Sequence, residues 1–155
     1  MNIIFLDVDE EKEIKNHDDY CEETKEIVVT WPLNERTMLM LRTLIKETNS
    51  FIVVSSSLKK NKEYIQTFLE KLEKYKLLDR MIGYTYSINN NREVEILNFL
   101  KQLHNDVKFI IMSDDINRFS KLKNYVVEID DYQNLLEEQL KKTVALFKMQ
   151  EEGKI

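Results

Sequence analysis

Three short apolar segments constrain the fold of this chain more than any other feature of its sequence. Residues 3–6, 51–55 and 107–113 each carry a continuous apolar run rather than an alternating pattern. Strands that are apolar on both sides are buried on both faces, which is typical of a parallel sheet covered by helices. Segments with helical periodicity separate these strands. We therefore predict a doubly wound α/β fold with a mainly parallel sheet and helices on both faces.

The remaining segments complete this pattern of alternating strands and helices. We predict helices over residues 34–47, 61–75, 92–103 and 132–149, and further strands over 81–84 and 124–129. Residues 10–31 are charge-rich and aperiodic, and we interpret them as a short flap in which "KEIVVT" could form a strand. The sequence has no linker, so we expect one domain over residues 1–155 with a mobile tail at 150–155.

Composition limits the classes of protein to which the chain can belong. The 155 residues suffice for one well-packed core, and two glycines and one proline favour a high helix content. No apolar run is long enough to span a membrane. Cys21 is the only cysteine, which fits a reducing, cytoplasmic location. A net charge of −5 argues against a stable nucleic-acid complex, and nothing fixes the oligomeric state.

Acidic and hydroxyl side chains follow the three apolar strands directly. Asp7 and Asp9 follow the first, a run of three serines from Ser55 follows the second, and Asp114 and Asp115 follow the third. Ligands of open α/β sheets bind beyond the carboxyl ends of the strands. Carboxylates crowded there repel one another unless a cation lies among them, and hard oxygen ligands suit Mg²⁺. We therefore predict a site for Mg²⁺ and a phosphate group.

Asp7 and Asp9 have the spacing that brings two carboxylates to one phosphate. Residues i and i+2 of a strand project to the same side. One carboxylate could attack phosphorus, while the other exchanges a proton with the leaving oxygen and with water. Arg92 begins a predicted helix and could supply a balancing positive charge, although Lys59 or Lys60 could do the same.

Four stretches of the chain, in order, resemble the motifs of the haloacid-dehalogenase-like (HAD) phosphohydrolases. They are "IIFLDVDE", "FIVVSSS", Arg92 and "FIIMSDD". The phrase "IVVSSSLKK", the "REVEILNFL" helix and "FIIMSDD" look closer still to small capless HAD domains associated with nucleic-acid repair. The resemblance covers residues 2–147 and implies that the strands that precede Asp7, Ser55 and Asp114 lie side by side.

The resemblance also implies a role for each matching residue. Asp7 and Asp9 would be catalytic, as nucleophile and general acid/base. The expected phosphate ligands are Ser55, Ser56 and Arg92, and the expected Mg²⁺ ligands are Asp7, Asp9, Asp114 and Asp115. The implied activity is Mg²⁺-dependent hydrolysis of a phosphomonoester through an aspartyl-phosphate intermediate. The substrate would be a phosphorylated small molecule, a nucleotide or a phosphorylated nucleic-acid end.

Some positions depart from the family pattern or leave alternatives open. Glu10 stands where many relatives have glycine, and it adds negative charge at the mouth of the site. A relative that binds a phosphorylated ligand or protein without turnover is therefore the alternative. A receiver-like signalling domain does not fit the order of the motifs. Tyr84 and Tyr86 could line the mouth, and we expect Glu95 on the solvent face of its helix.

Overall fold

A computed structural model describes residues 1–7, 12–16, 25–29, 35–55, 62–103, 106–129 and 137–155. Its main feature is a five-stranded parallel sheet with the order β5-β4-β1-β6-β7. The strands are β1 (Asn2–Asp7), β4 (Ser50–Val54), β5 (Met81–Tyr84), β6 (Lys108–Ser113) and β7 (Val126–Glu128). The predicted parallel sheet is confirmed, and β1 is its central strand.

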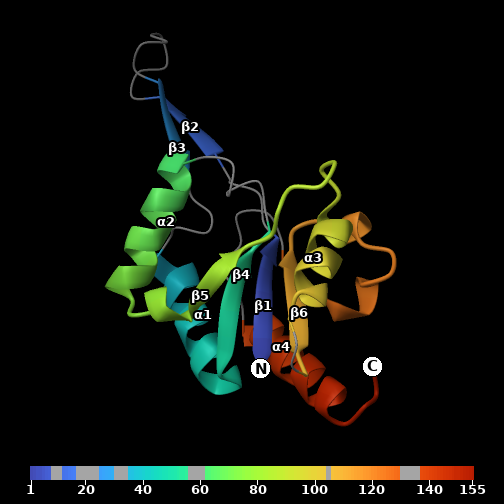
Figure 1. Ribbon diagram of the computed structural model, residues 1–155. Helices are drawn as coiled ribbons and strands as arrows, with labels where there is room; N and C mark the ends of the chain where they lie inside the picture. The colour runs from blue at the N-terminus through green and yellow to red at the C-terminus, as the bar shows by residue number, and fades with distance from the viewer. Residues whose placement is uncertain (8–11, 17–24, 30–34, 56–61, 104–105, 130–136) are drawn as a thin grey trace.

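Helices cover both faces of this sheet, as predicted (Figure 1). They are α1 (Glu35–Thr48), α2 (Lys62–Lys74), α3 (Arg92–Lys101) and α4 (Glu137–Glu151). Successive strand residues point to opposite faces, so β1 contributes to two apolar layers. Ile4 and Leu6 pack in the layer that contains residues of α1, α2 and α4. Ile3 and Phe5 pack in the layer that contains α3 and residues 116–126.

The predicted apolar faces of the helices lie where burial requires them. Met38, Leu41, Leu44 and Ile45 of α1 are all buried, and so are Phe68 and Leu72 of α2. On the opposite face, the Phe5 ring meets Phe99 of α3 at a centroid distance of 5.8 Å in an edge-to-face arrangement. None of the described helices has the length and apolar character that crossing a lipid bilayer requires.

Helix and strand ends differ from the prediction by a few residues at most where they are described. The predicted start of the last helix at residue 132 lies outside the described residues. Its end differs, because α4 continues past Met149 to Glu151. The Gln150 side chain explains this extension: its amide donates to the Phe109 carbonyl at 2.7 Å and accepts from the Phe109 N–H at 2.9 Å.

The segment interpreted as a flap contains a two-stranded antiparallel sheet. β3 (Lys25–Val29) confirms the strand suggested by "KEIVVT", and it pairs with β2 (Lys12–Asn16), which the sequence reading did not anticipate. Both strands are short and charged, so the alternation of polar and apolar residues that marks a half-buried strand is weak in them. In Figure 1 this pair lies at the end of the molecule toward which β1 points.

Candidate active site

Asp7 is the last residue of the central strand and lies at the centre of the candidate site. Its side chain is fully buried. The strand register places Asp7 opposite Ser113 of β6 and places the preceding Leu6 opposite Val54 of β4. The ends of three neighbouring strands therefore meet at Asp7, as the family resemblance implied. Alternation puts Asp7 on the same face as Ile3 and Phe5, which is the face covered by α3.

Two arginines and a serine surround the Asp7 carboxylate. Oδ2 accepts a hydrogen bond from Ser113 Oγ at 2.9 Å and lies 3.2 Å from Arg118 Nη1. Oδ1 lies 3.1 Å from Arg92 Nε, in an ion pair without the alignment of a hydrogen bond. Oδ1 accepts no hydrogen bond from the described residues. The positive charge of Arg92 thus stabilises Oδ1, but no hydrogen bond from the described residues occupies it. Such an oxygen is suited to act as a nucleophile.

Burial raises the pKa of Asp7 above its ordinary value. Removing a carboxylate from water disfavours its charged form, and this effect exceeds the opposing influence of Arg118, Ser113 and Arg92, in that order. An ionised Asp7 therefore depends on its positive neighbours. A further cation at the site would favour ionisation in the same direction.

Arg118 is the site residue that sequence reasoning missed. It ends a short 3₁₀ helix, Ile116–Arg118, and its Nη1 lies 3.0 Å from Asp114 Oδ1 as well as 3.2 Å from Asp7 Oδ2. One nitrogen thus bridges two of the four carboxylates that were predicted to bind metal, those of Asp7 and Asp114. The available signal was the phrase "SDDINR", in which an arginine follows Asp114 by one helical turn. An arginine four residues after an acid in a helical turn can pair with that acid.

The described residues fit a divalent cation in their chemistry. Asp7 and Asp114 converge on one positive group, and two carboxylates with waters are a usual protein contribution to Mg²⁺ binding. Within the described part of the chain, no cluster of three or more His, Cys, Asp or Glu side chains could hold a metal. Asp9, the expected further ligand, lies outside the described residues. A cation bound by Asp7 and Asp114 would compete with Arg118 for their oxygens.

Asp115 occupies a different environment from Asp114. Its carboxylate accepts a hydrogen bond from the Asn117 N–H at 3.0 Å and thereby caps the 3₁₀ helix that carries Arg118. Its side chain is 47% exposed, whereas that of Asp114 is 10% exposed. The structure therefore brings Asp114 to Asp7 and leaves Asp115 at the rim, 4.0 Å from Arg118 Nε.

Arg92 lies beside Asp7 because of how α3 begins. Asn91 caps the helix by accepting a hydrogen bond from the Val94 N–H at 3.1 Å, and Arg92 is the first helical residue. The Arg92 guanidinium also lies 3.7 Å from Glu95. Glu95 is fully buried, so the expectation that it faces solvent was wrong. One turn of helix separates the two residues, and that spacing points both side chains toward the sheet.

Ser55 lies at the adjoining strand end, as predicted. Its side chain is fully buried, and both its N–H and its hydroxyl donate to the carbonyl of Leu6, at 3.0 and 3.3 Å. These bonds fix Ser55 next to the residue that precedes Asp7. Several other predicted contributors lie outside the described residues: Asp9, Glu10, Ser56, Lys59 and Lys60.

A carboxylate anchor holds the two arginine-bearing segments together. Glu93 Oε2 accepts hydrogen bonds from the N–H groups of Ser120, Lys121 and Leu122 at 2.8, 2.9 and 3.0 Å. Its Oε1 accepts from the Ser120 hydroxyl at 3.1 Å. Burial opposes ionisation of Glu93, but these hydrogen bonds outweigh burial and lower its pKa. Glu93 thus joins the start of α3 to the chain that follows Arg118.

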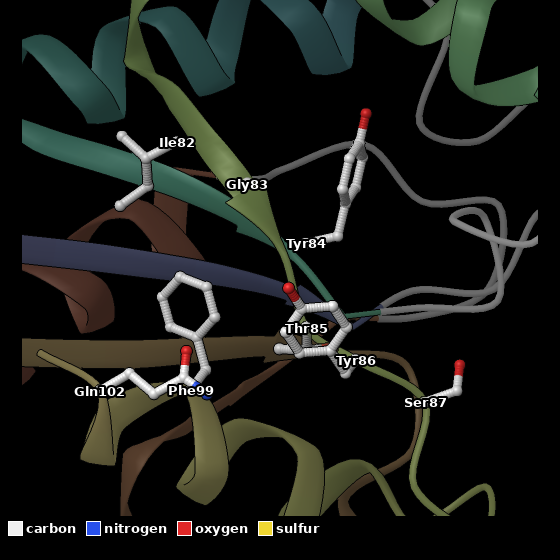
Figure 2. Close-up of a pocket in the computed structure, with 8 residues that line it drawn as sticks. All are labelled: Ile82, Gly83, Tyr84, Thr85, Tyr86, Ser87, Phe99 and Gln102. Carbon is white, nitrogen blue, oxygen red and sulfur yellow. The ribbon is translucent and has the colours of Figure 1, made fainter.

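Two cavities flank this end of the sheet. One, of about 390 Å³, is lined by Asn89, Asn90, Asn91, Arg92 and Arg118. It is polar and positively charged, so it suits an anion. A second cavity, of about 510 Å³, lies along β5 and the residues that follow it, with Phe99 of α3 and Gln102, the residue after α3, opposite (Figure 2).

The sheet order and the acidic residue at the end of its central strand define an α/β domain of the HAD-like class. Comparison with protein families supports this class directly, because residues 3–140 match the family described as "HAD domain in Swiss Army Knife RNA repair proteins". The chain belongs to this family. Membership associates it with RNA repair and with phosphohydrolase-type chemistry. Searches of curated proteins and of solved structures gave no match.

Proposed function

We propose that the protein is a Mg²⁺-dependent phosphohydrolase that removes a terminal phosphate from RNA through an aspartyl-phosphate intermediate. The observation that carries this proposal is the environment of Asp7. It is a buried carboxylate at the central strand end, charge-paired with two arginines, and its Oδ1 accepts no hydrogen bond from the described residues. The family association with RNA repair supports a phosphorylated RNA end as the substrate. The lone Cys21 fits a cytoplasmic enzyme.

The proposed chemistry divides between two carboxylates. Asp7 Oδ1 attacks phosphorus, and the bond from phosphorus to the ribose oxygen breaks. Asp9 gives that oxygen a proton and later takes one from the water that hydrolyses the aspartyl phosphate. Arg92 and Ser55 bind the phosphoryl oxygens, and Ser56 is the further phosphate ligand of the predicted set. Free phosphate leaves, and Asp7 returns to its starting state.

Mg²⁺ would be held by Asp7 and Asp114, with Asp9 and Asp115 as the remaining ligands of the predicted set. When bound, it supplies positive charge against the phosphoryl oxygens. Arg118 would then leave the oxygens that it bridges. Because Arg118 also lines the anion-suited cavity with Arg92, its guanidinium remains close enough to join Arg92 in phosphate binding.

The test is a panel of phosphate esters that includes 5′- and 3′-phosphorylated RNA oligonucleotides, with Mg²⁺ or with EDTA. We expect the wild type to release phosphate with Mg²⁺ and Asp7→Asn to release none. Asp79→Asn is the matched control, because Asp79 is an exposed residue in the 3₁₀ helix before β5, at the opposite end of the sheet. Absence of release from every ester would contradict the proposal.

One observation favours a second function, in which the protein binds a phosphorylated ligand or partner without turnover. Arg118 already neutralises Asp7 and Asp114, so the site is charge-compensated in part without a metal. Under this alternative, phosphorylated RNA binds to the wild type but is not hydrolysed. Measurement of binding and of phosphate release on the same oligonucleotides separates the two functions.

A further inference from the structure

The larger cavity lies at the free edge of the described sheet. β5 ends the strand order on that side, and residues 82–87 form one wall of the cavity. Phe99 of α3 and Gln102, which directly follows that helix, form the other wall, as Figure 2 shows. At about 510 Å³ it lies within the range of small-molecule sites. The proposed chemistry at Asp7 uses none of its lining residues.

The lining of this cavity is aromatic and uncharged. Tyr86 is 71% exposed and Tyr84 is 42% exposed, while the Phe99 ring is half-buried. None of the eight described residues that line the cavity is charged, but Gln102 and Ser87 add amide and hydroxyl groups. A phosphate would find no counter-charge here. A flat, neutral ring with a polar edge matches both the rings and the polar groups.

A glycine keeps the floor of the cavity open. Gly83 lies in β5 at φ +156°, next to a shift in the register between β4 and β5. A Cβ at this position would lie 4.0 Å from Phe99 Cε2, so a larger side chain would extend into the space between β5 and α3. Gly83 therefore leaves the space between β5 and Phe99 unfilled by a side chain of its own.

The cavity is continuous along the chain with the candidate active site. The connection between β5 and α3 lines the aromatic cavity at residues 85–87 and the polar cavity at residues 89–91. It ends at Arg92, whose Nε lies 3.1 Å from Asp7. From β5 toward α3, the chain thus presents neutral aromatic side chains first and the positively charged Arg92 last. A nucleotide strand presents the same order of groups: bases without charge, and a charged terminal phosphate.

We propose that this cavity binds the unpaired nucleobase next to the terminal phosphate of an RNA strand. The base stacks on Tyr86, and its polar edge contacts Ser87 or Gln102. This inference rests on the proposed function, because the phosphate at Asp7 fixes which base reaches the cavity. Sequence-tolerant stacking also agrees with a repair enzyme that must accept many ends.

The experiment measures binding to Asp7→Asn, which separates affinity from turnover. The probes are short phosphorylated RNA strands with 2-aminopurine or an abasic unit at the terminal nucleotide. We expect 2-aminopurine fluorescence to fall on binding, and Tyr86→Ala to weaken binding of the intact strand at least about fivefold. Tyr86→Phe, which keeps the ring, should bind nearly as the parent does. Tyr86→Ala should not weaken binding of the abasic strand any further.

Equal affinity of Tyr86→Ala and its parent for the intact strand would overturn the inference. So would an equal loss for intact and abasic strands, which would indicate a role other than base stacking. Melting curves check that Tyr86→Ala is folded. Because the Tyr86 ring is largely exposed, its removal should leave the melting temperature unchanged. If phosphorylated RNA is hydrolysed by the wild type but Tyr86 has no effect, this inference alone fails. If base-dependent binding occurs without any hydrolysis, the proposed phosphatase activity fails instead.

Discussion

Loss of the Glu93 carboxylate should destabilise the protein measurably and disturb the candidate active site. Glu93 is 8% exposed and accepts hydrogen bonds from three consecutive backbone N–H groups and one hydroxyl. Glu93→Ala leaves the three N–H groups without this acceptor. An unsatisfied buried donor costs roughly 1–3 kcal/mol. Leu122 is buried, so its N–H would stay without an acceptor. Ser120 and Lys121 are exposed, so water can accept hydrogen bonds from their N–H groups in place of Glu93.

Together, these lost hydrogen bonds should lower the free energy of unfolding of Glu93→Ala by about 3 kcal/mol, and most of this loss comes from the Leu122 N–H. Glu93→Gln keeps one acceptor oxygen but loses the charge and the second acceptor oxygen, so it should lower the free energy of unfolding by about 1–2 kcal/mol. Both values are large against the roughly 5–15 kcal/mol that stabilises an ordinary domain. The free energy of unfolding from urea denaturation at neutral pH measures them. Glu137→Gln, the same substitution in an exposed surface ion pair, is the matched control and should change stability by less than about 0.5 kcal/mol.

The pH dependence of the free energy of unfolding tests whether the ionised Glu93 carboxylate is the source of this stability. The pKa of Glu93 is lower in the folded protein than its ordinary value of 4.5. Its carboxylate therefore stabilises the fold fully above about pH 4.5, and this contribution is lost as the pH falls through the lower folded pKa. The difference in unfolding free energy between wild type and Glu93→Gln should narrow over that interval. A difference that stays constant down to pH 3, or a Glu93→Ala variant as stable as the wild type, would refute the reasoning.

Three further predictions concern the site and the core. Arg118→Gln should bind Mg²⁺ about tenfold more tightly in calorimetry, because Arg118 and a cation compete for the same carboxylate oxygens; unchanged or weaker Mg²⁺ binding would count against this competition. Phe5→Ala should lower the free energy of unfolding by about 3–5 kcal/mol, because it removes a fully buried ring that contacts Phe99 and Phe109. Gln150→Ala removes two hydrogen bonds to the Phe109 backbone and should cost about 1–2 kcal/mol, measured by thermal melting; a loss below about 0.3 kcal/mol would show that water replaces them.

Much of the fold could be predicted because burial leaves a direct trace in the sequence. Continuous apolar runs at β1, β4 and β6 marked strands covered on both faces. The helical spacing of Met38, Leu41, Leu44 and Ile45 marked the buried face of α1. β2 was missed because a charged strand carries little of this signal.

The candidate site could be predicted only in part, for a physical reason. Asp7, Ser55 and Asp114 lie at strand ends, and parallel strands bring their carboxyl ends to one edge. Arg118 and Glu95 gave no such signal. An arginine after an acidic pair and a glutamate on a helix are ordinary surface residues in most proteins. The contact of Arg118 with Asp7 and the burial of Glu95 beside Arg92 depend on the path of the chain around the sheet.

The sequence by itself determined the alternation of strands and helices and the residues that follow each strand. It also determined the family to which the chain belongs. Only the tertiary structure decided which charges meet. Arg118 and Asp7 are 111 residues apart, and Glu93 is 29 residues from the Leu122 N–H that it accepts. Local periodicity reports whether a residue faces the core. Periodicity does not report which distant side chain or backbone group a buried residue will contact, because that contact depends on how separate segments of the chain pack together.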